Sequence, residues 1–271
     1  MNASNSFRSA YAPVNGLAMY YEVHGAGEPL ILVHGGFGVT GMFAPLLPAL
    51  AAHHQVIAVE LQGHGHTADI DRPFSYQHFA DDIAALVEHL GLRQADVLGY
   101  SLGGGVALQS AIRHPGLVRK VVVISAPFCR DGWFADVRAG MGSIDADALI
   151  GSPMHDIYTA LAPHPENWPR LVNKTRQMLS TPYDWGADVA ALAMPALLIM
   201  GDADSIPPTH AAAMFALLGG GQRDAGWEGT ARPASQLAIL PGTTHYDILS
   251  HTDLLAPILA AFLSTLPPST A

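Results

Sequence analysis

Short apolar stretches rich in Val, Ile and Leu alternate along this chain with segments of helical periodicity, and this alternation constrains the fold more than any other feature. Strands buried on both faces have continuous apolar runs of this kind, and crossover helices separate them in parallel sheets. The order therefore predicts an α/β fold with helices flanking a parallel sheet. The predicted strands cover residues 18–24, 30–34, 55–60, 95–100, 120–125, 196–201 and 237–241.

Two helices are predicted with some detail. Residues 76–90 carry apolar side chains at helical spacing, which places them on one face for packing against the sheet. Residues 102–114 form a helix that begins directly after Ser101 and ends before Pro115.

The composition of the 271 residues indicates a globular protein with a large core, because 49% are apolar and 13% are charged. A formal charge of −10 gives no positive field for nucleic acid or an anionic membrane surface, so neither is expected as a partner. The longest apolar run, 189–200, contains Pro195 and falls short of the ~18 residues of a membrane span. With Cys129 as the single cysteine and no apolar signal segment in 1–15, we expect a cytoplasmic protein.

The strand and helix rhythm lapses between residues 126 and 193, a segment rich in aromatic residues and broken by prolines. We interpret this segment as a helical cap or lid inserted into a core domain that comprises residues 1–125 and 194–271. A second interruption, 219–236, is polar and Gly-rich and is expected to be a surface loop.

The strongest chemical signal is the Gly-x-Ser-x-Gly motif around Ser101, which lies between an apolar strand and a helix. A serine hydroxyl needs an exposed, strained turn to act as a nucleophile. The flanking glycines allow this turn because they have no Cβ atom that would clash. The alternative interpretation is a helix N-cap serine in a Gly-rich turn.

A serine nucleophile also needs a base and an acid that orients the base. His245 follows the last predicted strand, and Asp204 follows the strand 196–201, so both would lie at the carboxyl edge of the sheet. Asp202 is the second choice for the acid, and either aspartate could instead belong to a turn.

Acyl transfer also requires donors for an oxyanion. The backbone N–H of Leu102 is one candidate. The other lies in the Gly-rich turn after strand 30–34, where Gly36 is favoured and Phe37 is the alternative.

These motifs together resemble the α/β-hydrolase family over residues 18–266. The matching motifs are His34-Gly35-Gly36, Gly63-His64-Gly65, Gly99-Tyr-Ser-Leu-Gly103, Gly201-Asp-Ala-Asp204 with Pro207, and His245. The resemblance implies a mostly parallel eight-stranded sheet, the order nucleophile, acid, histidine, no required cofactor and often a helical cap. Two features depart from it: Glu60 stands where members commonly have Asp, and residues 219–236 lengthen the stretch between acid and histidine.

The nucleophile separates members of this family, because its dehalogenases and epoxide hydrolases use Asp where this chain has Ser101. We therefore predict a serine carboxylesterase for small to medium apolar esters, with Phe37, Trp133 and Trp185 lining the substrate pocket. A carbon–carbon bond hydrolase and a small-molecule receptor without turnover remain as alternatives. We also consider a homodimer, and the loop 219–236 is a candidate for its contact. His64, His66 and Asp69 lack the full spacing of a metal motif, so no metal is expected.

Overall fold

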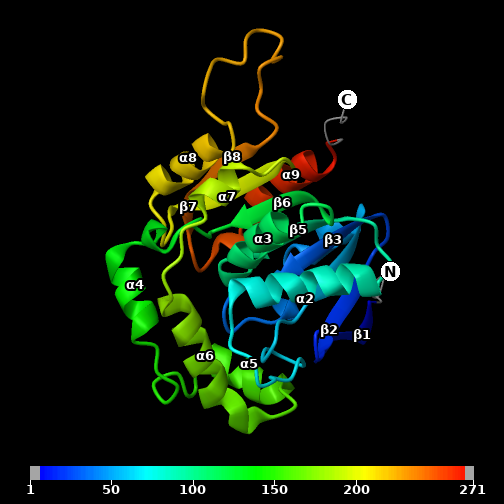
Figure 1. Ribbon diagram of the computed structural model, residues 1–271, viewed down its shortest axis with the longest axis vertical. Helices are drawn as coiled ribbons and strands as arrows, with labels where there is room; N and C mark the ends of the chain where they lie inside the picture. The colour runs from blue at the N-terminus through cyan, green and yellow to red at the C-terminus, as the bar shows by residue number, and fades with distance from the viewer. Residues whose placement is uncertain (1–6, 266–271) are drawn as a thin grey trace.

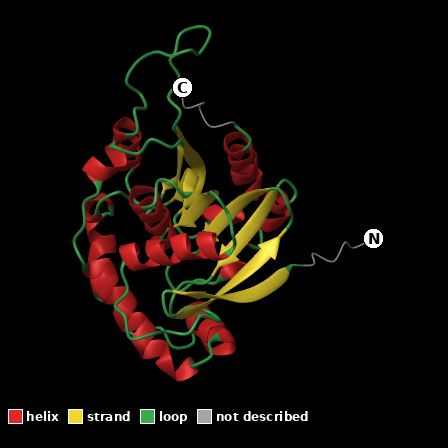
Figure 2. Ribbon diagram, turned by 45° about the vertical axis from the view of Figure 1, so that its right-hand side comes forward, coloured by secondary structure: helices red, strands yellow, loops and turns green. Residues whose placement is uncertain are grey.

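The computed structural model describes residues 7–265, so the first six residues of the segment 1–15 and the end of the core range 194–271 lie outside the described residues. An eight-stranded sheet runs through the molecule in the order β1-β2-β4-β3-β5-β6-β7-β8 (Figures 1 and 2). β2 is antiparallel to both β1 and β4, and the other neighbours are parallel. The strands are β1 (Arg8–Val14), β2 (Leu17–His24), β3 (Glu28–Val33), β4 (His54–Val59), β5 (Ala95–Tyr100), β6 (Val118–Ile124), β7 (Ala196–Ala203) and β8 (Gln236–Thr244).

The predicted α/β fold and mostly parallel eight-stranded sheet are confirmed, and all seven strands assigned from the sequence are present with small differences at their ends. The strand β1 was not predicted, because its residues are mostly exposed and include Pro13. It pairs with β2 through a tight turn at Asn15 and Gly16, whose φ angles are +48° and +84°. Positive φ at both central residues is the geometry that Asn-Gly turns favour in hairpins.

Helices cover both faces of the sheet. α2 (Tyr76–His89) and α3 (Leu102–Arg113) lie on one face and agree with the two predicted helices, whereas α1 (Leu47–Ala51) and α9 (Thr252–Leu263) lie on the other. α8 (Pro208–Leu217) packs against β7 and β8. Short 3₁₀ turns occur at Thr40–Phe43 and Ile248–Ser250.

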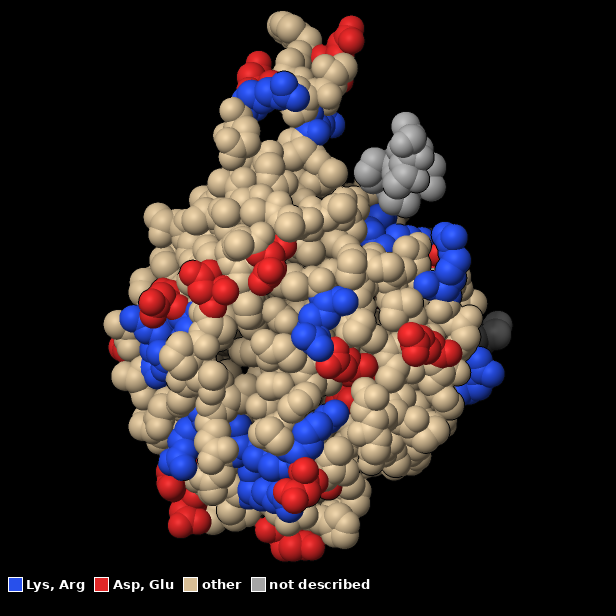
Figure 3. Space-filling model, viewed as in Figure 1, with Lys and Arg blue, Asp and Glu red and all other residues tan. Residues whose placement is uncertain are grey.

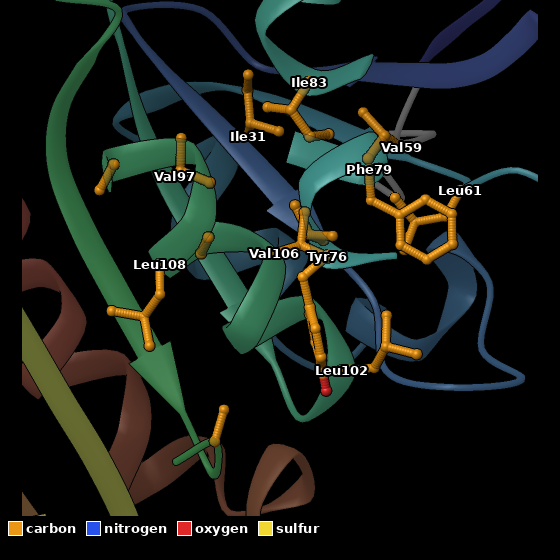
Figure 4. Packing of buried hydrophobic residues seen from close by; sticks show 14 of the residues in the cluster. Ile31, Val59, Leu61, Tyr76, Phe79, Ile83, Val97, Leu102, Val106 and Leu108 are labelled. Atoms are coloured by element: carbon orange, nitrogen blue, oxygen red, sulfur yellow. The ribbon is translucent and has the colours of Figure 1, made fainter. Parts of the chain in front are cut away.

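Alternation along the central strands divides the core between these two layers. In β3, Ile31 and Val33 pack toward α2 and α3, and Leu30 and Leu32 pack toward α1 and α9. Successive side chains of a strand point to opposite faces, so one continuous apolar run serves both layers. Figure 4 shows the first layer, where Phe79 and Ile83 of the α2 helix meet the sheet.

Residues 126–193 contain helices between β6 and β7, and we call this segment the insertion. In Figure 1, its helices α4, α5 and α6 lie together beside the sheet. Its last helix, α7, instead packs against α3 and α8 of the surrounding fold. The helices are α4 (Ala135–Gly142), α5 (Pro153–Leu161), α6 (Trp168–Ser180) and α7 (Gly186–Ala190), with 3₁₀ turns at Arg130–Gly132 and Pro165–Asn167.

The polar loop between α8 and β8 projects from the molecule at the end away from α5 and α6 (Figure 1). Trp227 in this loop is fully exposed. The loop therefore does not border the carboxyl ends of β5 and β7, where the predicted site residues lie. Within residues 7–265, no helix combines the length and apolar character needed to cross a membrane.

Candidate active site

Ser101 lies on a sharp turn between β5 and α3, with φ +55° and ψ −119°. A non-glycine residue in this region of backbone space carries about 1–3 kcal/mol of strain, which the surrounding structure must hold in place. The two glycines of the motif make the turn possible, because a Cβ atom on Gly99 would collide with the backbone of Gly103, and one on Gly103 would collide with Val33. The serine is therefore presented at the carboxyl edge of the sheet.

His245 follows β8 and points its ring at this serine. Its Nε2 atom lies 3.0 Å from Ser101 Oγ, and its Nδ1 atom lies 3.0 Å from Asp204 Oδ1. The hydroxyl of Tyr100 donates to the backbone carbonyl of His245 at 2.5 Å, and this bond ties the loop that carries His245 to the end of β5. The structure thus brings Ser101, His245 and Asp204 into one hydrogen-bonded chain.

Asp204 is buried at the end of β7, and both of its oxygens accept hydrogen bonds. Oδ1 accepts from His245 and from the Ser205 N–H, and Oδ2 accepts from Ser125 Oγ at 2.5 Å and from the Gly201 N–H at 3.1 Å. Burial by itself raises the pKa of Asp204, but the hydrogen bonds from His245 and Ser125 hold it below its ordinary value. The carboxylate is therefore charged at neutral pH and orients the imidazole.

Asp202, the second choice for the acid, has a different environment. It is exposed, and its Oδ1 atom accepts the backbone N–H of Gly242 at 2.9 Å. This bond connects the ends of β7 and β8 and leaves the contact with His245 to Asp204.

The proposed oxyanion donors lie beside the serine. Residues 35–38 form a tight turn in which the Gly38 N–H donates to the Gly35 carbonyl at 3.0 Å and Phe37 has φ +58°. A Cβ atom on Gly36 would lie 3.7 Å from the Leu102 side chain, so this turn and the start of α3 are adjacent. Within residues 7–265, the N–H groups of Gly36, Phe37 and Leu102 donate to no acceptor, which leaves them available to a ligand.

Comparison with known proteins decides the family. The sequence matches the family described as alpha/beta hydrolase fold over residues 28–149. Over 92% of this chain and 100% of the relative, it is 30% identical to the pimeloyl-(acyl-carrier protein) methyl ester esterase of Xylella fastidiosa strain 9a5c. The chain belongs to the α/β-hydrolase family. Because the match to this esterase covers the full length of the relative, the protein is identified as an esterase-type hydrolase.

Solved structures of other α/β hydrolases share the fold. Carboxylesterase CesB from Bacillus subtilis superposes with a TM-score of 0.71 at 20% identity, covering 96% of this chain and 92% of that one. The enol-lactonase from Burkholderia xenovorans LB400 superposes with a TM-score of 0.70 at 19% identity, covering 94% of this chain and 100% of that one. At these identities the agreement concerns the fold.

The three residues predicted to line the substrate pocket of this α/β hydrolase occupy different places. Trp133 is buried with its ring 5.4 Å from that of His245, and Phe37 lies 5.8 Å from Trp168 of α6. Trp185 packs on Tyr183, with ring centroids 4.2 Å apart, and on Tyr76 of α2. Trp133 therefore borders His245 and Phe37 lies against α6, whereas Trp185 joins the insertion to the core.

Helix α6 of the insertion is tied to the core by a charged contact. Lys174 Nζ lies 2.8 Å from both carboxylate oxygens of Asp69 and also contacts the carbonyls of Ile70 and Arg72. Asp69 also accepts the side chain of Gln62 at 2.7 Å. Figure 3 shows Lys and Arg side chains gathered over this part of the molecule, with acidic side chains among them. This contact holds α6 over the turn 35–38.

Glu60 holds the loop after β4 through its side-chain carboxylate. The buried carboxylate accepts the His66 N–H at 2.6 Å and lies 3.0 Å from His66 Nδ1. Burial raises its pKa. Gly65 has φ +50°, and a Cβ atom on it would meet this carboxylate, so a larger residue is strained at this position. Among the described residues, no group of three or more His, Cys, Asp or Glu side chains is arranged to hold a metal ion.

Ser125 was not identified from the sequence, although it lies at the carboxyl end of β6. It is fully buried with φ +52°, and its hydroxyl donates to Asp204. The only signal in the sequence is that a polar residue ends a buried strand. Many serines with a purely structural role occupy such a position. Its contact with Asp204 makes it a positioning residue.

Replacing Ser125 with alanine is expected to lower kcat/KM roughly tenfold, because a charge-assisted hydrogen bond to Asp204 is lost. That bond lowers the pKa of Asp204, so its removal raises this pKa and moves the acidic loss of activity to higher pH. The measurement is a pH–rate profile for both proteins. Ser110→Ala removes another buried hydroxyl, one that bonds within α3, and serves as the control. An unchanged acidic limb in Ser125→Ala would contradict the positioning role.

Stability is expected to fall on acidification, because His34 and His64 are buried in their neutral forms. Burial lowers the pKa of His34 to about 3 and that of His64 to about 4. A histidine in the unfolded chain has a pKa of about 6.5. Below that pH the unfolded state binds more protons, so the free energy of unfolding decreases as pH falls. We expect a loss of about 2 kcal/mol per histidine between about pH 7.5 and about pH 5 in urea unfolding. His64→Gln should show a smaller loss, and an equal loss would contradict the assignment.

Proposed function

We propose that this protein is a serine carboxylesterase that cleaves small to medium, largely apolar carboxylic esters. The observation that carries the proposal is the chain of contacts from Ser101 Oγ to His245 Nε2 and from His245 Nδ1 to Asp204, both at 3.0 Å, on a strained strand-to-helix turn. A nucleophile, a base and an orienting acid in this geometry form the arrangement used for acyl transfer.

In the proposed mechanism, Ser101 Oγ attacks the acyl carbon while His245 Nε2 takes the hydroxyl proton. The oxyanion that forms accepts hydrogen bonds from the N–H of Leu102 and from that of Gly36 or Phe37. The imidazolium, stabilised by the Asp204 carboxylate, returns the proton to the leaving alcohol. A water molecule then attacks the acyl-enzyme with His245 again as base, which releases the acid and restores Ser101.

The surroundings of Ser101 support an apolar substrate of limited size. Trp133 borders His245, Phe37 lies beside the proposed oxyanion donors, and α6 covers the turn that carries Phe37. These aromatic walls favour apolar acyl or alcohol groups. The Xylella fastidiosa relative is named for a methyl ester, so methyl esters belong among the test substrates.

Hydrolysis of p-nitrophenyl esters from acetate to palmitate is expected to peak at short or middle acyl lengths. The reason is that α6 lies against the turn 35–38, and we expect it to limit the length of acyl chain that the site accepts. The measurement is kcat/KM for each ester. A maximum at palmitate would contradict the proposed size, and no turnover of any ester by the folded protein would overturn the esterase and favour a carbon–carbon hydrolase or a receptor.

A further inference from the structure

The imidazole of His245 contacts aromatic rings in addition to the two residues that bond to its nitrogens. Ser101 and Asp204 occupy those nitrogens. The ring centroid of Tyr100 lies 5.4 Å from that of the imidazole at an interplanar angle of 32°, and the ring centroid of Trp133 lies 5.4 Å away at 72°. Hydrogen bonds at the two nitrogens fix a line through the imidazole but tolerate a tilt about that line. The neighbouring side chains therefore decide how firmly the imidazole is held.

The aromatic neighbours of His245 differ in how firmly they are held themselves. The ring of Tyr246 also lies 5.4 Å from the imidazole, but this residue is 85% exposed and can turn away into solvent. Tyr100 and Trp133 are 7% and 4% exposed, so both stay in contact with the imidazole. Tyr100 belongs to β5 of the core, whereas Trp133 belongs to the insertion. The insertion thus supplies one of the two buried contacts.

The backbone around Trp133 is joined to the segment that carries the acid. Arg138 Nη1 donates to the carbonyl of Trp133 at 2.8 Å. The next residue, Phe134, donates its N–H to the carbonyl of Ser205 at 3.1 Å, and Ser205 directly follows Asp204. The insertion and the acid are therefore held together beside the histidine.

The side chain of Trp133 packs into a small apolar cluster of its own. The other buried members are Met200 of β7, Ala211 of α8 and Ile206 between these two elements. A ring packed at this density keeps a single orientation, because any other position overlaps its neighbours. The cluster therefore holds the indole against His245.

We propose that Trp133 is a positioning residue that holds the imidazole of His245 in line with Ser101 and Asp204. The inference rests on the proposed esterase function and deepens it, because the insertion then supports the base as well as bordering the substrate. Proton transfer between Ser101 and His245 depends on this alignment, and small displacements cost large factors in rate. His245 serves as base in both acylation and deacylation, so a tilted imidazole slows both steps and changes KM little.

Trp133→Leu tests the inference directly, because it keeps an apolar side chain but removes the ring. We expect kcat to fall about 10- to 100-fold for p-nitrophenyl esters of every acyl length, with KM within about threefold of wild type. Trp133→Phe restores an aromatic ring and should keep kcat within about fivefold of wild type. Tyr158→Leu is the matched control, since it removes another buried ring of the insertion, one whose hydroxyl donates to the His164 carbonyl. Its kcat is expected to stay within about threefold.

Arg138→Met tests the same contact without altering the tryptophan ring. It removes the hydrogen bond to the Trp133 carbonyl, and kcat is expected to fall about fivefold with KM unchanged. Arg130→Met is the control, because Arg130 lies in the same segment but donates its side-chain N–H to the Leu179 carbonyl at 3.1 Å. This control is expected to keep the wild-type kcat.

The proton on Nδ1 of His245 reports the position of the imidazole without any turnover. Its hydrogen bond to Asp204 slows its exchange with water, so we expect a separate downfield proton NMR signal in the wild type that His245→Gln lacks. In Trp133→Leu this signal should broaden or disappear because the imidazole tilts. Trp133→Phe and Tyr158→Leu should both retain it.

The outcomes distinguish this inference from the function on which it rests. A wild-type kcat in Trp133→Leu, or a change confined to KM or to the favoured acyl length, would overturn the inference and leave Trp133 as a wall of the site. A loss of kcat with an unchanged NMR signal would also overturn it. If Trp133→Leu does not fold, a wild-type kcat in Arg138→Met is the contradicting result. Cleavage of no ester by the wild type would overturn the esterase, while the NMR comparison would still decide whether Trp133 holds the imidazole.

Discussion

Ser101→Ala is expected to lower kcat for the best p-nitrophenyl ester by about 10⁴- to 10⁶-fold. In the proposed mechanism the serine oxygen forms the acyl-enzyme, and within the hydrogen-bonded chain of Ser101, His245 and Asp204 it has no substitute. Residues that act as a unit lose nearly all of their effect when one is removed. Steady-state hydrolysis by wild type and variant, in parallel, measures the effect.

The variant should fold normally, because alanine fits the same turn and Ser101 makes no side-chain capping bond to α3. Circular dichroism and the unfolding midpoint provide the control. A second control is the burst of p-nitrophenol that accompanies acylation in the wild type, which the variant should lack. Activity within tenfold of wild type would contradict the assignment of Ser101 as nucleophile.

Asp204→Asn is expected to lower kcat by about 10³- to 10⁴-fold. The asparagine keeps the shape of the side chain but removes the charge that stabilises the imidazolium. In the wild type, Asp204 Oδ1 accepts a hydrogen bond from His245 Nδ1 at 3.0 Å. The amide NH₂ of asparagine is a donor, so it can favour the tautomer of His245 in which Nδ1 carries no proton. The measurement is kcat at neutral pH with the same ester.

Asp202→Asn is the matched control, two residues away on the same strand end. This side chain is exposed and accepts the Gly242 N–H through Oδ1, a role that the asparagine oxygen can keep. Its activity is expected to stay within about threefold of wild type. The reverse result, with Asp202→Asn inactive and Asp204→Asn active, would assign the acid to Asp202.

The order of strands and helices was predictable because each central strand is buried on both faces and has an uninterrupted apolar run. β5 was predicted at its observed bounds, and the elbow after it follows from the motif around Ser101. β1 was missed, since a mostly exposed edge strand has little apolar signal. The Asn15–Gly16 pair between β1 and β2 was the available clue, because this dipeptide favours hairpin turns.

The candidate site was predictable only in part. Ser101 stands out by its motif, but His245 is one of 14 histidines and was chosen by its place after a strand. The choice between Asp204 and Asp202 depends on which carboxylate turns inward, and in the sequence both directly follow the predicted strand 196–201. Ser125 carries no motif that marks it, so its contact with Asp204 had to be observed.

By itself, the sequence determined the alternation of strands and helices, the elbow at Ser101 and the place of each site residue at the carboxyl end of a strand, because these depend on local periodicity and turn chemistry. The tertiary structure decided which groups meet. Asp204 is joined to His245 and Ser125, and α6 is tied to Asp69. These outcomes depend on contacts between residues far apart in the chain, whose distances and burial no local pattern specifies.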